Sequence, residues 1–307
     1  MSTANTVSLP PSSGTQANLR AWASGLKAQI LAAGWGQTSD TGQTAAASLT
    51  VPAGTGSQFE IFHMSDTLQG TNPMMLKLGY GELSSGDGRP AIWISIGQGT
   101  DGAGNLTGNT TGPFGICSQS QSSTSYNCYF SGDTNRFGIA LWSDPLLNSP
   151  MQDPIIFVIE RTKNASGADT GEGIIILANS TYNTGLGYTS RSVVASTLST
   201  VLPLGAFGVP TPYGQWLTPS SPAGSLANGA NVGVLFITPI GYQPYGPGFA
   251  ALVYQGTDFS PLTTQSIPGI YGSSHTYLPL GQTSDVGNSS VPNSIVPMHC
   301  HVMIRFE

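Results

Sequence analysis

One stretch of the chain has the apolar spacing of an amphipathic helix. From Thr15 to Ala33, apolar residues recur at steps of three and four, which places them on one face of a helix. They are Leu19, Trp22, Leu26, Ile30 and Ala33. Ser13 or Thr15 can cap the start of this helix, and Gly34 follows where a left-handed residue commonly ends one. We expect the helix to pack across one side or end of a sheet. Docking onto a neighbouring subunit is the alternative.

After Gly34 the pattern changes to short runs rich in Ile, Val, Phe, Tyr and Trp, separated by Gly, Asn, Asp and Ser. Some runs alternate, as in 92–96, and others are continuously apolar, as in 174–177. This mixture is typical of a sandwich in which some strands are covered on both faces. The predicted strands are Phe59–Met64, Met74–Tyr80, Ala91–Ile96, Phe137–Trp142, Pro154–Glu160, Gly173–Ala178, Val232–Pro239, Phe249–Tyr254 and His299–Phe306.

These patterns predict an all-β fold: an antiparallel β-sandwich or jelly-roll-like body with one N-terminal amphipathic helix and a long irregular arm. Helix-length patterns do not alternate with the strands, as a parallel α/β sheet would require. The arm is rich in Ser, Thr, Gly and Pro. The C-terminal strands either complete the same sandwich or form a second small β-domain. We therefore divide the chain into an N-terminal segment and helix (1–34), a sandwich core (35–178), an extended arm or linker (179–231) and C-terminal strands (232–307).

Charge is scarce in this chain. Its 307 residues include 9 Lys and Arg and 15 Asp and Glu, 8% in all, beside 40 Gly and 22 Pro. An ordinary soluble domain carries about 25% charged residues. A surface of hydroxyl and amide groups is desolvated at a lower cost than a charged one. The composition therefore favours a homo-oligomer, or a subunit of a larger assembly, whose surface is covered by other subunits.

Composition and charge also argue against several classes of partner. The net charge is −6 and the basic residues are scattered, so no cationic track for phosphates is expected and nucleic-acid binding is not predicted. No run of about 18 apolar residues suggests a membrane span. The first residues lack the basic start and apolar core of a secretory signal. We therefore expect a protein made and kept in a cytoplasm, or released from it by lysis.

The three cysteines do not make a disulfide framework. Cys117 and Cys128 flank a polar loop, so they can sit across a hairpin neck and be bridged after release from a reducing cell. Two reduced, partly buried thiols are the alternative expected of a cytosolic product. Cys300 has no partner in the sequence and is interpreted as a small core residue.

The segment Gly97–Asn105 allows three interpretations. Its glycines resemble a phosphate-binding loop, but the Lys-Ser/Thr pair of that motif is missing. Asp101, Asn105 and Thr107 could offer oxygens to calcium, although their spacing does not match an EF-hand. A tight hairpin explains the same residues more simply, because Asp-Gly supplies the positive φ that such turns need. We predict the hairpin.

No metal, cofactor or catalytic site is predicted. His299 and His301 share a face of a predicted strand and could hold zinc only if a facing strand supplied a further ligand. The sequence contains no G-x-S-x-G elbow, and no acid–His pair stands out. Paired carboxylates, as in glycosidases, can be proposed by residue type alone. These candidates are Glu60, Asp66, Glu82, Glu160 and Glu172.

Several segments of the sequence together resemble structural proteins of tailed bacteriophages. They are FEIF at 59–62 with SDTLQ at 65–69, PMMLKLGYG at 73–81, PAIWI at 90–94 with GQGTDGAG at 97–104, SGDTNRF at 131–137 and ERTKNASGADTGEG at 160–173. The resemblance covers residues 15–178 and is weaker afterwards. It implies a virion component of the tail, neck or baseplate, made in the bacterial host and present in several symmetric copies beside other virion proteins. It carries no catalytic residues.

The charges at Arg136 and at 160–163 stand out in a chain that otherwise avoids charge. We expect them to pair within or between subunits; for Lys163 a solvated turn is equally compatible.

Three functions compete on this sequence. The first is a non-enzymatic virion structural protein that forms a symmetric oligomer. The second is a receptor- or carbohydrate-binding part of a phage tail fibre, with a host surface glycan as partner. A polysaccharide depolymerase is the third and requires paired carboxylates beside a groove. The aromatic residues that could stack on a sugar, or anchor an interface instead, are Trp142, Trp216, Tyr242 and Tyr245.

Overall fold

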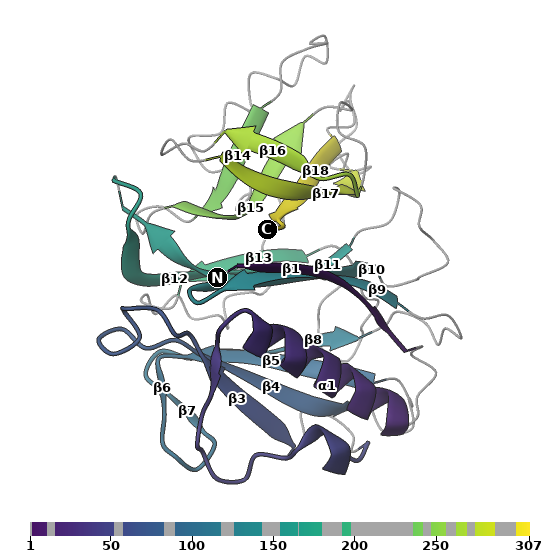
Figure 1. Cartoon of the computed structure of the whole chain (residues 1–307), viewed down its shortest axis with the longest axis vertical. Helices are drawn as coiled ribbons and strands as arrows, with labels where there is room; N and C mark the ends of the chain where they lie inside the picture. The colour runs from purple at the N-terminus through teal and green to yellow at the C-terminus, as the bar shows by residue number, and fades with distance from the viewer. Residues whose placement is uncertain are drawn as a thin grey trace, which may run out of the picture.

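The computed structural model describes residues 2–10, 16–51, 58–82, 90–117, 126–142, 154–164, 166–179, 192–197, 236–241, 247–255, 262–268, 274–285 and 299–307. In these ranges the chain forms antiparallel sheets and a single α-helix, which confirms the mainly-β prediction. Figure 1 shows three sheets stacked as layers, which we call lower, middle and upper after their places in that view.

The lower sheet has the strand order β2-β3-β4-β5-β8, and its neighbours are antiparallel. Its strands are β2 (Gly36–Gln37), β3 (Phe59–His63), β4 (Met75–Glu82), β5 (Pro90–Gly97) and β8 (Thr111–Cys117). Between β5 and β8 the chain forms the small hairpin of β6 (Gly99–Thr100) and β7 (Leu106–Thr107). A short 3-10 helix, η1 (Ala46–Ser48), lies between β2 and β3 in the sequence.

The middle sheet has the order β1-β9-β10-β11-β12-β13, so the N-terminal strand joins strands far along the chain. Its strands are β1 (Thr3–Leu9), β9 (Tyr126–Asp133), β10 (Arg136–Trp142), β11 (Pro154–Lys163), β12 (Asp169–Asn179) and β13 (Ser192–Thr197). The predicted arm or linker at 179–231 lies mostly outside the described residues. Its described part, 192–197, is β13, which pairs with β12.

The upper sheet is formed by C-terminal strands alone, in the order β14-β15-β18-β17-β16. They are β14 (Phe236–Gly241), β15 (Pro247–Gln255), β16 (Gln265–Pro268), β17 (Ser274–Asp285) and β18 (His299–Arg305). This sheet lies over the middle one, with β15 against β11 and β18 against β10 (Figure 1).

The helix α1 (Gln16–Ala32) packs within its own chain, against β1 and β9 of the middle sheet and β4 and β5 of the lower sheet. The whole predicted apolar stripe is buried, so docking of this face onto a neighbouring subunit is wrong. Gly34 follows the helix with φ of 93°, as the ending signal predicted. The predicted caps Ser13 and Thr15 lie outside the described residues.

The main core fills the space between the helix, the lower sheet and the middle sheet. It includes Trp22 and Ile30 of α1, Leu78 and Ile94 of the lower sheet, and Phe137 of the middle sheet. A cavity of about 10 Å³ at its centre is lined by apolar side chains only. With no polar group to orient a ligand, this cavity is a packing defect of the core.

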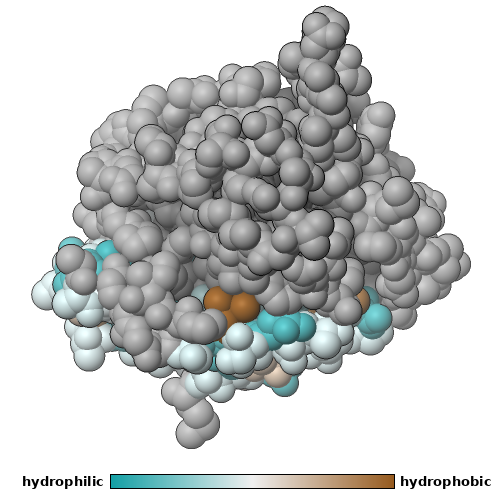
Figure 2. All heavy atoms as spheres, turned by 90° about the horizontal axis from the view of Figure 1, so that it is seen from above, coloured by the Kyte–Doolittle hydropathy of each residue, from teal (hydrophilic) through white to brown (hydrophobic). Residues whose placement is uncertain are grey.

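All nine predicted strands are present, with ends that differ by a few residues; residues 232–235 of the predicted strand Val232–Pro239 lie outside the described residues. The prediction missed β1, β2, β8, β9, β13, β16 and β17. The described ranges contain no helix long and apolar enough to cross a membrane. In the view from above, the described residues are mostly teal or white, and brown ones are few (Figure 2). Leu31 and Leu262 are the exposed large hydrophobic residues of the described part.

Candidate functional site

The middle sheet has two faces of different chemistry. On β11, Phe157 and Ile159 point into the apolar core below the sheet, so the alternating residue Glu160 lies on the opposite face, toward the upper sheet. On β10, Phe137 faces the core and Arg136 lies on the upper face, directly opposite Glu160 in the ladder. Both charged side chains are 2% exposed. The upper face therefore buries charge, which requires partners.

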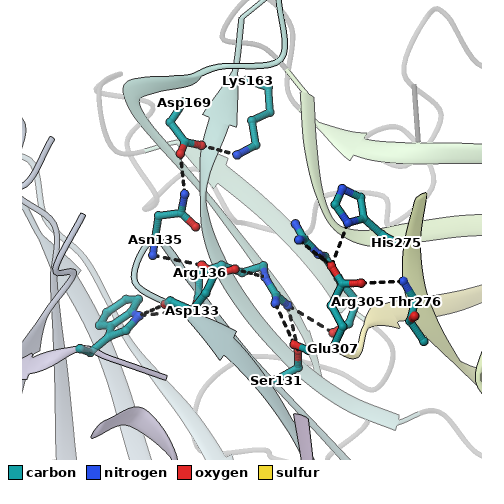
Figure 3. A network of polar contacts seen from close by, with 11 residues as sticks. Ser131, Asp133, Asn135, Arg136, Lys163, Asp169, His275, Thr276, Arg305 and Glu307 are labelled. Carbon is teal, nitrogen blue, oxygen red and sulfur yellow. Dashed lines mark hydrogen bonds and ion pairs between the residues drawn. The ribbon is translucent and has the colours of Figure 1, made fainter. Parts of the chain in front are cut away.

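Charged residues of the middle and upper layers gather at one end of the middle sheet (Figure 3), and a contact between Arg161 and Asp66 joins the lower layer to them. We call this group the interlayer charge cluster. It consists of Asp66 from the lower layer, Asp133, Arg136, Glu160, Arg161, Lys163 and Asp169 from the middle sheet, and Arg305 and Glu307 from the upper layer.

Arg136 links the middle sheet to the C-terminal segment. Its Nη1 donates to the Ser131 hydroxyl at 2.9 Å and to the main-chain oxygen of Arg305 at 3.3 Å. Its Nη2 lies 3.5 Å from the main-chain oxygen of Glu307, and its Nε lies 3.4 Å from a carboxylate oxygen of Asp133. Burial lowers the pKa of Arg136, although Asp133 opposes the shift. One guanidinium thus holds two layers together.

The Glu307 carboxylate collects donors from the upper layer. It accepts hydrogen bonds from Arg305 Nε at 2.7 Å, from the Thr276 backbone N–H at 2.9 Å and from His275 Nδ1 at 2.8 Å (Figure 3). Burial alone would raise the pKa of Glu307, but the Thr276 N–H and Arg305 together hold it below its ordinary value of 4.5. The carboxylate is therefore bound in its ionised form.

Acid is expected to loosen this part of the upper sheet. A folded-state pKa below the unfolded one makes the Glu307 contribution complete above about pH 4.5 and lost as the pH falls through the folded pKa. Hydrogen exchange at the Thr276 amide, followed from pH 6 to about pH 3 and corrected for intrinsic rates, should lose protection in that window. In Glu307→Gln the step should disappear. An equal loss of protection in both proteins would contradict the assignment.

Arg161 extends the cluster to the lower layer. Its guanidinium forms a two-point contact with Asp66, with Nε 2.7 Å from Oδ2 and Nη2 3.2 Å from Oδ1, and Nη1 donates to the Gly171 oxygen at 3.3 Å. The Arg161 side chain is 0% exposed and that of Asp66 is 8% exposed. At the rim, Lys163 pairs with Asp169, which also accepts a hydrogen bond from Asn135. The predicted pairing of these charges therefore occurs within the chain.

A second buried charge lies under the helix. Glu60 of β3 is 0% exposed and accepts from Lys27 Nζ of α1 at 2.6 Å, from the Tyr80 hydroxyl at 3.0 Å and from Gln37 Nε2 at 3.3 Å. Burial and the Glu60 charge raise the pKa of Tyr80 well above its ordinary value. This pKa keeps Tyr80 a hydrogen-bond donor. Of the candidate carboxylates, Glu60 and Glu160 are buried and Asp66 is partly buried, with its side chain 8% exposed, and all three lie in contacts within the chain; the side chains of Glu82 and Glu172 are not described.

The predicted hairpin at Gly97–Asn105 is confirmed as β6 and β7. Asp101 accepts hydrogen bonds from the N–H groups of Ala103 and Asn105, so its carboxylate closes the turn. Asp40 anchors the hairpin by accepting from the Thr100 hydroxyl at 3.0 Å and the Gly104 N–H at 3.2 Å. The Asp101 carboxylate, one of the oxygen donors considered for calcium, is thus used by the turn itself. The described residues contain no group of three or more His, Cys, Asp or Glu placed to hold a metal.

Gly104 of this hairpin should tolerate no side chain. Its φ is +92°, and an added Cβ would lie 2.2 Å from Cζ of Phe59, whose ring also receives Lys77 Nζ at 4.1 Å. Strain and overlap together should make Gly104→Ala lower the free energy of unfolding by about 2–4 kcal/mol in urea titration. Gly102→Ala is the matched control, because Gly102 has φ of +78° but open space, and should cost about 1–2 kcal/mol. Equal losses would contradict the overlap.

The basic residues of the described part all have partners inside the chain. Beyond the pairs above, Arg20 donates to the Leu49 oxygen at 2.8 Å and Lys77 to the Gly104 oxygen at 2.7 Å. Among the charged residues whose side chains are described, Asp101 alone is exposed. The described charges therefore act mainly in contacts within the chain, and apart from Asp101 their side chains are buried or only partly exposed.

The predicted disulfide stays a prediction. Cys128 is a free, buried thiol of the middle sheet, and Cys117 lies in β8 of the lower sheet, where its side chain is not described. Burial raises the pKa of Cys128, which keeps it protonated and unreactive.

The predicted aromatic group is largely outside the described residues. Trp142 ends β10, but its side chain is not described, and Trp216, Tyr242 and Tyr245 lie outside the described ranges. The glycan-binding interpretation therefore stays a prediction. His299–His301 do lie in a strand, β18, without described side chains.

No protein-family model, curated protein or solved structure matches this chain.

Proposed function

We propose that this chain is a non-enzymatic structural component of a tailed-bacteriophage virion, part of its tail, neck or baseplate, and that it assembles as a symmetric oligomer. The observation that carries the proposal is the distribution of charge. The described cations are bonded inside the chain, and among the described charged residues Asp101 alone is exposed, while the others are buried or partly buried in contacts within the chain.

Such a surface suits permanent contact with other protein. Neutral hydroxyl and amide groups leave water at a lower cost than charges, and contacts between them depend little on salt. The buried pairs of the interlayer charge cluster hold the layers in fixed positions, which a subunit packed on several sides requires. The proposed body is sandwich- or jelly-roll-like, which is supported by the core shared between the lower and middle sheets.

The first test is the mass of the purified chain in solution, measured by light scattering at low and at high salt. We expect a defined multiple of the chain mass at both salt concentrations. A single-chain mass at working concentrations would contradict the proposed assembly. Mass spectrometry of gradient-purified virions should then detect the chain at a fixed ratio to other virion proteins, and its absence from the particles would contradict the virion assignment.

A further inference from the structure

The outer edges of the lower and upper sheets carry features that discourage pairing with another strand. In the lower sheet, edge strand β2 has only two residues, and edge strand β8 contains Pro113. In the upper sheet, edge strand β14 contains Pro239 and the four-residue β16 ends in Pro268. Short strands and proline are the usual protection of a sheet edge, because they remove main-chain hydrogen-bonding groups from it.

The two edges of the middle sheet lack this protection. Edge strand β1 has the sequence TANTVSL and edge strand β13 has the sequence SVVAST, with neither charge nor proline. Both strands pair with their inner neighbour without a bulge over their full length. Along β1, Asn5, Thr6 and Ser8 are exposed. Among the described strands, each of these two has a neighbour on one side only.

We propose that the middle sheet continues from one copy of the chain into the next, with the outer edge of β1 paired to β13 of a second copy. The sheet has six strands with antiparallel neighbours, so its two edge strands run in opposite directions. When a second copy is related to the first by rotation about an axis parallel to the strands, its β13 runs antiparallel to β1. Neighbouring strands then alternate in direction across the contact, as they do within each copy.

A second copy is the occupant that satisfies both edges with one kind of contact. Pairing of β1 with β1 would leave both β13 edges open, whereas head-to-tail contacts can close into a ring with no open edge. Neither strand carries a charge that would repel its counterpart. This inference rests on the proposed function in one respect, namely that the chain is an oligomer.

The test places a lysine on the edge, since lysine is a natural blocker of edge pairing. Thr6→Lys should reduce the solution mass to that of one chain, while circular dichroism and the unfolding midpoint stay close to those of the parent protein. Ser266→Lys is the matched control, because Ser266 is also exposed on an edge strand, β16, and receives the same charge. Its mass should equal that of the parent. If Thr6→Lys does not fold, Ser8→Lys takes its place.

The outcomes separate this inference from the proposed function. A folded Thr6→Lys protein that keeps the parent mass overturns the edge contact and leaves the proposed function standing. A single-chain mass in both Thr6→Lys and Ser266→Lys also overturns the edge contact, because a charge added to either sheet would then be enough to dissociate the oligomer. A parent protein of single-chain mass overturns both proposals together.

Cross-linking identifies the partner strand. Chains with Thr6→Cys are mixed with chains carrying Ala195→Cys, a substitution on β13, and treated with a short thiol-reactive linker. We expect a peptide that joins positions 6 and 195 of different chains. A product joining position 6 to position 6, or no product joining 6 to 195, overturns the head-to-tail arrangement.

Discussion

Replacing Arg161 with methionine is expected to lower the free energy of unfolding by about 3–5 kcal/mol. The variant leaves the Asp66 carboxylate, 8% exposed, without the guanidinium that contacts both of its oxygens. A carboxylate that is shielded from water and has no cation beside it loses hydration free energy without a compensating ion pair. Since domains are stable by about 5–15 kcal/mol, this loss should be evident in urea titration at neutral pH.

The double variant Arg161→Met with Asp66→Asn separates the lone charge from the lost packing. It removes the stranded carboxylate while keeping the shape of the side chain, so it should be more stable than the single variant. Replacing both members of a buried ion pair is often near neutral, whereas removing one is not. If the double variant were as unstable as the sum of the single variants, the two residues would be energetically independent and the pairing would be refuted.

The strands of the core could be predicted from the sequence because burial leaves a continuous apolar signal. In β11, the residues from Phe157 to Glu160 are all at most 2% exposed, which matches the expectation that some strands are covered on both faces. The strands β1 and β9 escaped prediction because TANTVSL and YNCYFSGD are rich in polar residues. The extended conformation of β1 comes from pairing with β9, more than a hundred residues away in the sequence, and β9 pairs on its other side with β10, the strand that follows it.

The hairpin at Gly97–Asn105 was predictable for the opposite reason. Its determinants, Asp101 and the glycines at positive φ, lie within a few residues of one another. The interlayer charge cluster has no such local signal. Arg161 and Asp66 are 95 positions apart, and Arg136 and Glu307 are 171 positions apart. The sequence could show that Arg136 and the charges at 160–163 were unusual, but only the folded chain shows that their partners are internal.

Replacing Arg136 with leucine is expected to lower the free energy of unfolding by about 2–4 kcal/mol and to weaken the contact between the middle and upper sheets. Arg136 is 2% exposed, and its removal deprives Ser131 and the main-chain oxygens of Arg305 and Glu307 of a donor. Glu160, directly opposite in the ladder, would lose its neighbouring cation. Hydrogen exchange should therefore accelerate in β18 more than in the lower sheet.

Two further variants distinguish the specific hydrogen bonds of the Arg136 guanidinium from a general effect of losing one charge. Arg136→Lys keeps the charge, but an ammonium cannot reproduce the fork of donors, so it should recover less than half of the lost stability. Lys163→Met is the matched control from the same cluster. Its ion pair with Asp169 is partly exposed, with side chains 17% and 27% accessible, and should be worth about 0–1 kcal/mol. Were Lys163→Met as destabilising as Arg136→Leu, or were β18 exchange unchanged in Arg136→Leu, the layers would not depend on the buried guanidinium. We expect Arg136→Leu to lose the most free energy of unfolding and Lys163→Met the least. The reason is burial, because a charge contributes most to stability where water can least replace its partners.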